Sequence, residues 1–154
     1  IGHSERRKYF NETDEILSKK LERAIEVGLN VVFCVGEYLE LRRKNAHIRT
    51  IQEQVEPVRR VLAGGKIPVR IVVAYEPVWA IGTGMNASPS QINEMHLFIK
   101  SVLNDIEVVY GGSVSPENIG EIRRTGVVDG VLVGGASLNP RSFFQIIKGL
   151  AGGE

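Results

Sequence analysis

The stretch of sequence that decides the fold reads Ile71-Val72-Val73-Ala74-Tyr75-Glu76-Pro77-Val78-Trp79-Ala80-Ile81-Gly82-Thr83-Gly84. It begins as an unbroken apolar run, which is typical of a strand buried on both faces. The run ends at the carboxylate of Glu76, and Pro77 cannot extend a hydrogen-bond ladder. We interpret residues 77–84, with the apolar side chains of Trp79 and Ile81, as a lid that excludes water from a catalytic carboxylate. Two alternatives remain: Glu76 could cap this loop or pair with an arginine, and Trp79 and Ile81 could be core residues.

Strands alternate with helices along the chain. The predicted strands are residues 30–35, 71–75, 107–110 and 130–133. The predicted helices are one that Thr13 opens and Gly28 stops, and further ones over residues 38–62, 88–103, 116–125 and 140–150. Residues 1–4 match the end of one more strand, Ser4 is expected to cap a short helical turn, and Pro57 is expected to kink or divide the long helix. Alternation of this kind gives a parallel sheet through right-handed crossovers, so the predicted fold class is α/β.

A parallel sheet of this size is incomplete by itself. Its outer strands would have unpaired edges, and the predicted helices suffice to cover only one face well. The chain is therefore expected to be either an open, doubly wound sheet or about half of a closed eight-stranded barrel. Its length of 154 residues favours the half barrel, because a complete barrel has about 250 residues.

The composition narrows the range of partners and cellular settings. Hydrophobic residues make up 43% of the chain, which is enough for a core. Lys and Arg number 19 and Asp and Glu 18, so the charge gives no argument for nucleic acid or an acidic membrane surface. No apolar run approaches the ~20 residues of a membrane span, and no signal peptide is recognised. The single cysteine, Cys34, favours a reducing, cytoplasmic setting, and no residue spacing suggests a metal site.

Glycine-rich turns follow two consecutive predicted strands. They are Gly111-Gly112-Ser113 and Gly134-Gly135-Ala136-Ser137, and each precedes a helix. Glycines at such positions let backbone N–H groups approach an anion, and a helix N-terminus adds partial positive charge. The alternative is that these glycines only turn the chain. Because the pattern occurs twice, and because barrels bind phosphate at their last two strands, we favour a phosphate site.

Five motifs occur in order along the chain. They are Gly2-His3-Ser4-Glu5-Arg6-Arg7, Cys34-Val35-Gly36-Glu37, the stretch from Ala74 to Gly84, Tyr110-Gly111-Gly112-Ser113-Val114, and the stretch from Gly130 to Leu138. Together they resemble the triosephosphate isomerase family over the whole chain. The resemblance implies a partial (β/α)8 TIM barrel. Residues 1–154 would be the carboxyl-terminal part of a single barrel domain, with about strands 5–8, their helices and the tip of strand 4.

The resemblance also implies an activity. The family members are aldose–ketose isomerases, formally intramolecular oxidoreductases, which interconvert dihydroxyacetone phosphate and glyceraldehyde 3-phosphate through an enediol(ate) in glycolysis and gluconeogenesis. Glu76 would be the base and His3 the neutral electrophile, a pairing known from this family. Taken alone, a histidine at a strand end is most often polar surface. The other implied site residues are Gly82, Ser113, Gly134 and Gly135 for phosphate, with Glu5 and Trp79 as supporting residues.

The family pattern implies no cofactor and no metal, a small phosphorylated triose as substrate, a cytoplasmic location and a homodimer. One departure matters most. The family's first barrel strand supplies an Asn-x-Lys pair, and no asparagine here has a lysine two positions on. A lesser departure is Met85-Asn86-Ala87, where the family often has Lys-Thr-Ala. We therefore expect this chain alone to be inactive or very weakly active and to need the amino-terminal barrel half.

Two alternatives to an isomerase remain open. The chain could be a non-catalytic half barrel that assembles with a second copy or with a separate amino-terminal half. It could also be a phosphate-binding α/β module without isomerase chemistry.

Overall fold

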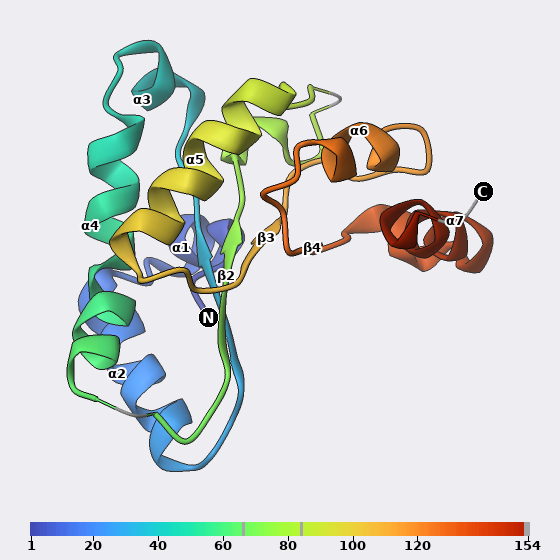
Figure 1. Cartoon of the computed structure of the whole chain (residues 1–154). Coiled ribbons are helices and arrows are strands. Elements are labelled where there is room, and N and C mark those ends of the chain that lie inside the picture. Colours follow the sequence, from blue (N-terminus) through green and yellow to red (C-terminus); the bar gives the residue numbers. More distant parts are fainter. Residues whose placement is uncertain (66, 84, 153–154) are drawn as a thin grey trace.

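The four predicted strands form one parallel sheet (Figure 1). The computed structural model describes residues 1–65, 67–83 and 85–152, so Gly84 of the predicted lid lies outside the described residues. Within this part of the chain the strands are hydrogen-bonded in chain order: β1 (Val31–Val35), β2 (Ile71–Tyr75), β3 (Val108–Tyr110) and β4 (Gly130–Val131). Ile1 lies beside β1, where its carbonyl accepts the Cys34 N–H at 2.8 Å. The opening residues therefore continue the sheet past β1, as their sequence predicts.

Helices connect the strands. The α-helices of the described residues are α1 (Ser4–Phe10), α2 (Asp14–Glu26), α3 (Leu39–Arg43), α4 (His47–Ala63), α5 (Pro89–Val102), α6 (Ile119–Arg124) and α7 (Pro140–Ala151). Two short 3-10 helices, η1 (Val78–Ala80) and η2 (Gly135–Leu138), follow β2 and β4 within the same described ranges. The helix α5 begins where the sequence predicts, because Ser88 and Gln91 form a reciprocal capping box at its N-terminus.

Alternation along the strands sorts their side chains onto two faces. Phe33, Val73 and Val108 are fully buried, and the strand register places Phe33 opposite Val73 and Val73 opposite Val108. They form an apolar row against the layer of α2, α4 and α5 that lies along one side of the sheet in Figure 1. Burial of each such side chain contributes about 1.5–3 kcal/mol, so this face holds the core.

The opposite face of the sheet is apolar but open. Val32, which is paired with Val72, exposes 42% of its surface, and Val72 and Val109 are only half-buried. A doubly wound sheet would carry helices over both faces. The described residues instead form an α/β fold of four parallel strands that alternate with helices on one side, consistent with a partial TIM barrel. The predicted fold class is confirmed.

The long helix predicted over residues 38–62 is divided, but not at Pro57. Pro57 lies inside α4, whereas the break between α3 and α4 falls at Asn45, whose φ of 53° is left-handed. Asparagine tolerates this conformation better than most residues. The chain then re-enters a helix after Ala46, whose N–H donates to the Leu41 carbonyl at 2.9 Å. A division at Pro57 was therefore the wrong prediction, because the tolerant asparagine, not the proline, sets the boundary.

Two further predicted boundaries shift. The strand predicted over residues 130–133 is paired only at Gly130–Val131, because β4 is the last strand of the described sheet and has a partner on one side only. The helix α6 begins at Ile119 and not at Pro116. The preceding residues form a turn in which the Asn118 side chain accepts the Ser115 N–H at 2.8 Å.

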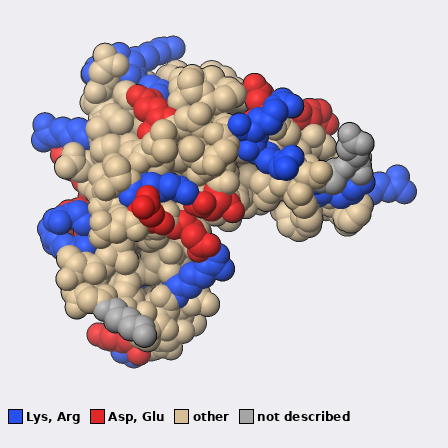
Figure 2. All heavy atoms as spheres, in the orientation of Figure 1, with Lys and Arg blue, Asp and Glu red and all other residues tan. Residues whose placement is uncertain are grey.

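The face of the molecule in Figure 2 shows no dominance of one charge sign that would indicate a strongly charged partner. Basic and acidic side chains are interspersed over the face shown in Figure 2. Among residues 1–65, 67–83 and 85–152, no helix combines the length and the apolar character that crossing a bilayer requires.

The left-handed conformation at Asn45 yields a test of the α3–α4 boundary. Replacing Asn45 with valine is expected to lower the free energy of unfolding by about 1–2 kcal/mol, because a β-branched residue is strained at positive φ. Asn45→Gly is the matched control and should be at least as stable as the unchanged chain. Urea denaturation measures both. Equal stability of the valine and glycine variants would contradict this account of the boundary.

Candidate active site

Strand alternation places the Glu76 carboxylate on the open face of the sheet. Tyr75 points toward the helices, so the next side chain points the other way. The Glu76 N–H still donates to the Val35 carbonyl at 2.7 Å, which holds the residue in the ladder. A Cβ on Gly36 would overlap the Glu76 carbonyl oxygen. Only glycine at position 36 therefore lets the ends of β1 and β2 approach this closely.

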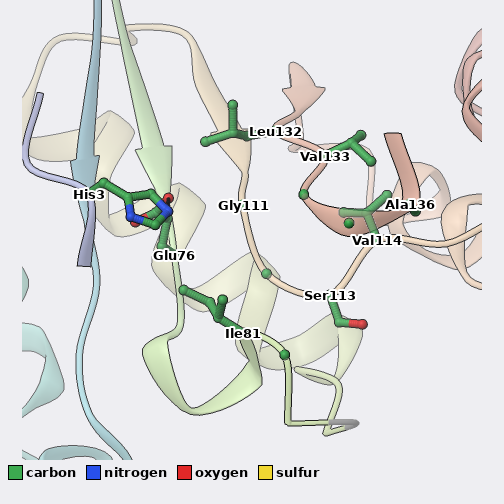
Figure 3. Close-up of a pocket in the computed structure, with 13 residues that line it drawn as sticks. His3, Glu76, Ile81, Gly111, Ser113, Val114, Leu132, Val133 and Ala136 are labelled. Carbon is green, nitrogen blue, oxygen red and sulfur yellow. Dashed lines mark ion pairs between the residues drawn. The ribbon is translucent and has the colours of Figure 1, made fainter. Parts of the chain in front are cut away.

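His3 lies beside Glu76 because it caps α1. Its Nδ1 accepts the Glu5 N–H at 3.3 Å, so Ser4 is the first residue of the helix and the predicted capping role of Ser4 was wrong. The imidazole thus satisfies one of the free N–H groups of the first helical turn. An accepting Nδ1 places the proton of a neutral ring on Nε2. That Nε2 lies 3.4 Å from Glu76 Oε1, and the two side chains point toward one another in Figure 3.

The Glu76 carboxylate is buried with few donors. Only 2% of the residue is exposed, and the Ser4 N–H donates to Oε2 at 3.3 Å. Burial raises the pKa of Glu76, and the nearby His3, the Ser4 amide and the Cys34 thiol oppose that shift. His3 lowers the pKa of Glu76 only when its imidazole is charged. Beside a neutral His3, burial therefore raises the pKa of Glu76 further. A carboxylate whose pKa is raised binds a proton more readily than an ordinary one, which suits a general base.

Cys34 is buried against the same carboxylate. Burial and, second to it, the negative charge of Glu76 raise the pKa of the Cys34 thiol to about 12. The thiol therefore stays protonated and packs as a small hydrophobe.

A cavity of about 510 Å³ opens in front of His3 and Glu76. Leu132 and Val133 line its far side in Figure 3, together with Val114 and Ala136. This apolar wall was not predicted, since Leu132 and Val133 were assigned to the strand that stops short at Val131. Six residues predicted for the site line the cavity: His3, Glu76, Gly82, Ser113, Gly134 and Gly135.

The two glycine-rich turns that line this cavity carry backbone amides without a hydrogen-bond partner among the described residues. Among the hydrogen bonds between described residues, none uses the N–H of Ser113 or of Gly134. Gly134 caps η2, which places a helix N-terminus at the same point. Free amides at a helix N-terminus favour an anion such as phosphate.

No role was predicted for Glu37, which anchors the start of the segment interpreted as a lid. Glu37 is fully buried and its Oε1 accepts the Trp79 Nε1–H at 3.0 Å and the Tyr75 hydroxyl at 3.1 Å. Arg42 Nε donates to the same oxygen at 2.7 Å. The position of Glu37 in the sequence could have indicated a role. It is a carboxylate just past the end of β1, as Glu76 is just past the end of β2.

The two predicted supporting residues lie outside the main cavity. Trp79 belongs to η1 and binds Glu37. Glu5 lines a neighbouring hollow of about 320 Å³, together with Lys8, Tyr9 and the lid residue Ile81. In the part of the chain that the structure describes, no group of three or more His, Cys, Asp or Glu side chains is arranged to hold a metal ion.

Comparison with known proteins agrees with this geometry. The family model described as triosephosphate isomerase matches residues 1–150. The chain belongs to the triosephosphate isomerase family.

Curated triosephosphate isomerases are similar over nearly the whole chain. The protein from Thermodesulfovibrio yellowstonii is 47% identical over 156 residues, which cover 96% of this chain and 62% of that protein. Those from Chloroherpeton thalassium and Dictyoglomus turgidum are each 45% identical over 157 residues, covering 96% of this chain and 62% and 63% of theirs. The chain thus spans about 62% of the length of these triosephosphate isomerases.

Burial of Glu76 predicts a pH-dependent effect on stability. Because its pKa is raised in the folded state, its stabilising contribution is complete at acidic pH and is lost as the pH rises through the folded-state pKa. Glu76→Gln is therefore expected to raise the free energy of unfolding at neutral pH, by on the order of 1 kcal/mol, with the gain shrinking as the pH falls. Urea denaturation at several pH values measures this. Glu22→Gln, at an exposed helix position, is the control, and a gain that grew toward acidic pH would contradict the assignment.

Proposed function

We propose that the chain is the part of a triosephosphate isomerase that carries the base, the electrophile and the phosphate site. In a complete barrel it would interconvert dihydroxyacetone phosphate and glyceraldehyde 3-phosphate through an enediol(ate). The observation that supports this most directly is the 3.4 Å separation of His3 Nε2 and Glu76 Oε1 beside the 510 Å³ cavity.

The proposed roles follow from the two side chains. Glu76 removes a proton from one carbon of the substrate and returns it to the neighbouring carbon. The His3 Nε2–H donates to the carbonyl oxygen, on which negative charge develops as the enediolate forms. A carboxylate base paired with a neutral histidine is the known chemistry of triosephosphate isomerases, and it comes to this chain through family membership.

Phosphate binding is assigned to the backbone around the two glycine-rich turns. The free amides of Ser113 and Gly134 support this role, with Gly82 and Gly135 on the same cavity. A lid over the bound substrate, carrying Trp79 and Ile81, would limit the entry of water and the loss of phosphate from the enediol. Glu5 is assigned a supporting position at the edge of the site.

The rest of the barrel is proposed to complete both the fold and the site. The open face of the sheet, which carries Val32, Val72 and Val109, needs other residues to cover it. The sequence also contains no Asn-x-Lys pair to supply a cation to the enediolate. We therefore assign this chain an obligatory amino-terminal barrel half, and a dimeric, cytoplasmic, glycolytic setting as in the family.

One observation favours a second candidate function. The free amides of Ser113 and Gly134 could bind a phosphate group without any use of Glu76. A phosphate-binding α/β module without isomerase chemistry is therefore the alternative to be tested.

An isomerase assay on the complete barrel that contains this segment tests the proposal. Glu76→Gln is expected to lower kcat by about 10²–10⁴-fold, the usual contribution of a general base. Its affinity for inorganic phosphate should be unchanged, because the phosphate amides are untouched. An unaltered kcat would show that Glu76 is not the base, whereas phosphate binding by an unsubstituted complete barrel that shows no turnover would favour the phosphate-binding module.

The same assay on the 154-residue chain alone tests the need for the other half. We expect no measurable turnover, because loss of one preorganised electrostatic group commonly costs about 10²–10³ in rate and the open face disrupts the site further. Addition of the amino-terminal half should restore activity. Turnover by the isolated chain near that of the complete barrel would contradict this dependence.

A further inference from the structure

A second, smaller cavity lies behind Glu76. Its volume is about 40 Å³, and it is lined by residues from the opening strand end, α1, the β1 turn, α4 and the lid: Gly2, Ser4, Arg7, Gly36, Tyr38, Gln54, Glu76 and Val78. Of the residues that the structure describes, Glu76 alone lines both this cavity and the 510 Å³ cavity in front. Glu76 thus separates the substrate side from this smaller cavity.

Arg7 is the cation on this rear cavity, and its side chain is 18% exposed. Its Nε donates to the Gly2 carbonyl at 3.0 Å and its Nη1 to Asp14 Oδ1 at 2.7 Å. Its Nη2 is buried and has no hydrogen-bond partner among the described residues. A buried, charged N–H group without an acceptor is costly, so such groups in native proteins generally bind an ordered water.

The rear cavity has room and partners for one water molecule. Its 40 Å³ exceeds the roughly 10–15 Å³ that a cavity needs to hold a water molecule. Gln54 is already engaged with Gly36, since its Oε1 accepts the Gly36 N–H at 2.8 Å and its Nε2 donates to the Gly36 carbonyl at 3.1 Å. The charged groups left on the cavity are Arg7 and Glu76, so a water there would accept from the guanidinium and donate to the carboxylate.

Arg7 also fixes the backbone that carries His3. Gly2 has a φ of +84°, and a Cβ there would lie 2.8 Å from the Cys34 carbonyl oxygen, so the Gly2 backbone is closely packed on that side. On the other side its carbonyl is held by the guanidinium of Arg7. The peptide that leads into His3 is therefore clamped between β1 and Arg7.

We propose that Arg7 is a positioning residue for the isomerase site: it clamps the Gly2–His3 peptide and, through one water in the rear cavity, orients the Glu76 carboxylate. This inference rests on the proposed function. Arg7 acts only through these groups and lies behind the carboxylate, away from the substrate cavity. The other titratable groups that face Glu76 are His3, Cys34, Tyr38 and the amino group of Ile1.

The test compares Arg7→Met with Arg23→Met in the complete isomerase that contains this segment. Arg23 forms an exposed ion pair with Glu26 on α2, so its variant controls for the loss of one arginine. Arg7→Met is expected to lower kcat by about 10–100-fold, because small displacements of reacting groups cost this much. KM should change less than about 3-fold, since the phosphate amides remain in place. The acid limb of the kcat/KM profile should move to higher pH, because the carboxylate loses a donor that favours its charged form.

A second variant keeps the proposal testable if Arg7→Met does not fold. Arg7→Lys keeps the charge but lacks the forked guanidinium, so it cannot hold both the Gly2 carbonyl and the water in the rear cavity. An intermediate kcat is therefore expected. Unchanged kcat and an unshifted acid limb in a folded Arg7 variant would overturn the proposal, and so would a dry rear cavity in a high-resolution crystal structure. A complete barrel with no activity before any substitution would instead refute the proposed function, so the two failures are distinguishable.

Discussion

The hydrogen bond from the Glu76 amide to the Val35 carbonyl is the constraint on which the site depends. At 2.7 Å it holds Glu76 at the last position of the β1–β2 ladder. The next residue, Pro77, has no N–H, so the ladder stops there. The chain then crosses the end of β1, where the Val78 N–H donates to the Glu37 carbonyl at 3.1 Å. One short stretch thereby fixes Glu76 in the sheet and starts the segment that was interpreted as a lid.

Two buried carboxylates at adjacent strand ends have opposite environments. Glu37 accepts from Arg42, Tyr75 and Trp79, so its charge is paired and it serves as an anchor. Glu76 has one backbone donor, the Ser4 amide, and a histidine whose charge is not required. Breaking a buried ion pair is costly, which makes Glu37 a fixed part of the structure. Burial, opposed by few donors, raises the pKa of Glu76, which suits its proposed role as a base.

The sequence predicts those features that depend on local chemistry. The apolar run of β2 and the start of α5 are recognisable from neighbouring residues, and both lie where predicted. The break at Asn45 depends on which residue best tolerates a left-handed conformation, a weaker signal than the proline that misled the boundary prediction. The end of β4 depends on whether a further strand lies beside it, which local sequence does not report.

The candidate site also combines features that depend on local sequence with features that depend on distant contacts. Its glycines and its carboxylate follow buried strands, so their shared rim could be predicted from the sequence. The role of Glu37 and the closeness of His3 to Glu76 could not be predicted, because they arise from contacts between distant parts of the chain. Glu37 and Trp79 are separated by 42 positions, and His3 and Glu76 by 73. The capping role of His3 was missed for a different reason: serine is the commoner cap, and nothing local shows that the imidazole reaches the free amide first.

The two ends of the cavity differ in how firmly the sheet supports them. His3 and Glu76 are built on β1 and β2, which pair over five residues and have a buried core behind them. Gly134 and Gly135 follow β4, which pairs with β3 at only two positions and is half-buried. Pairing on its free edge would lengthen β4 and fix the turn that follows. We infer that the turn after β4, the proposed phosphate site, depends on the rest of the barrel more than the His3–Glu76 pair does, so an incomplete barrel is expected to lose the geometry of that turn first.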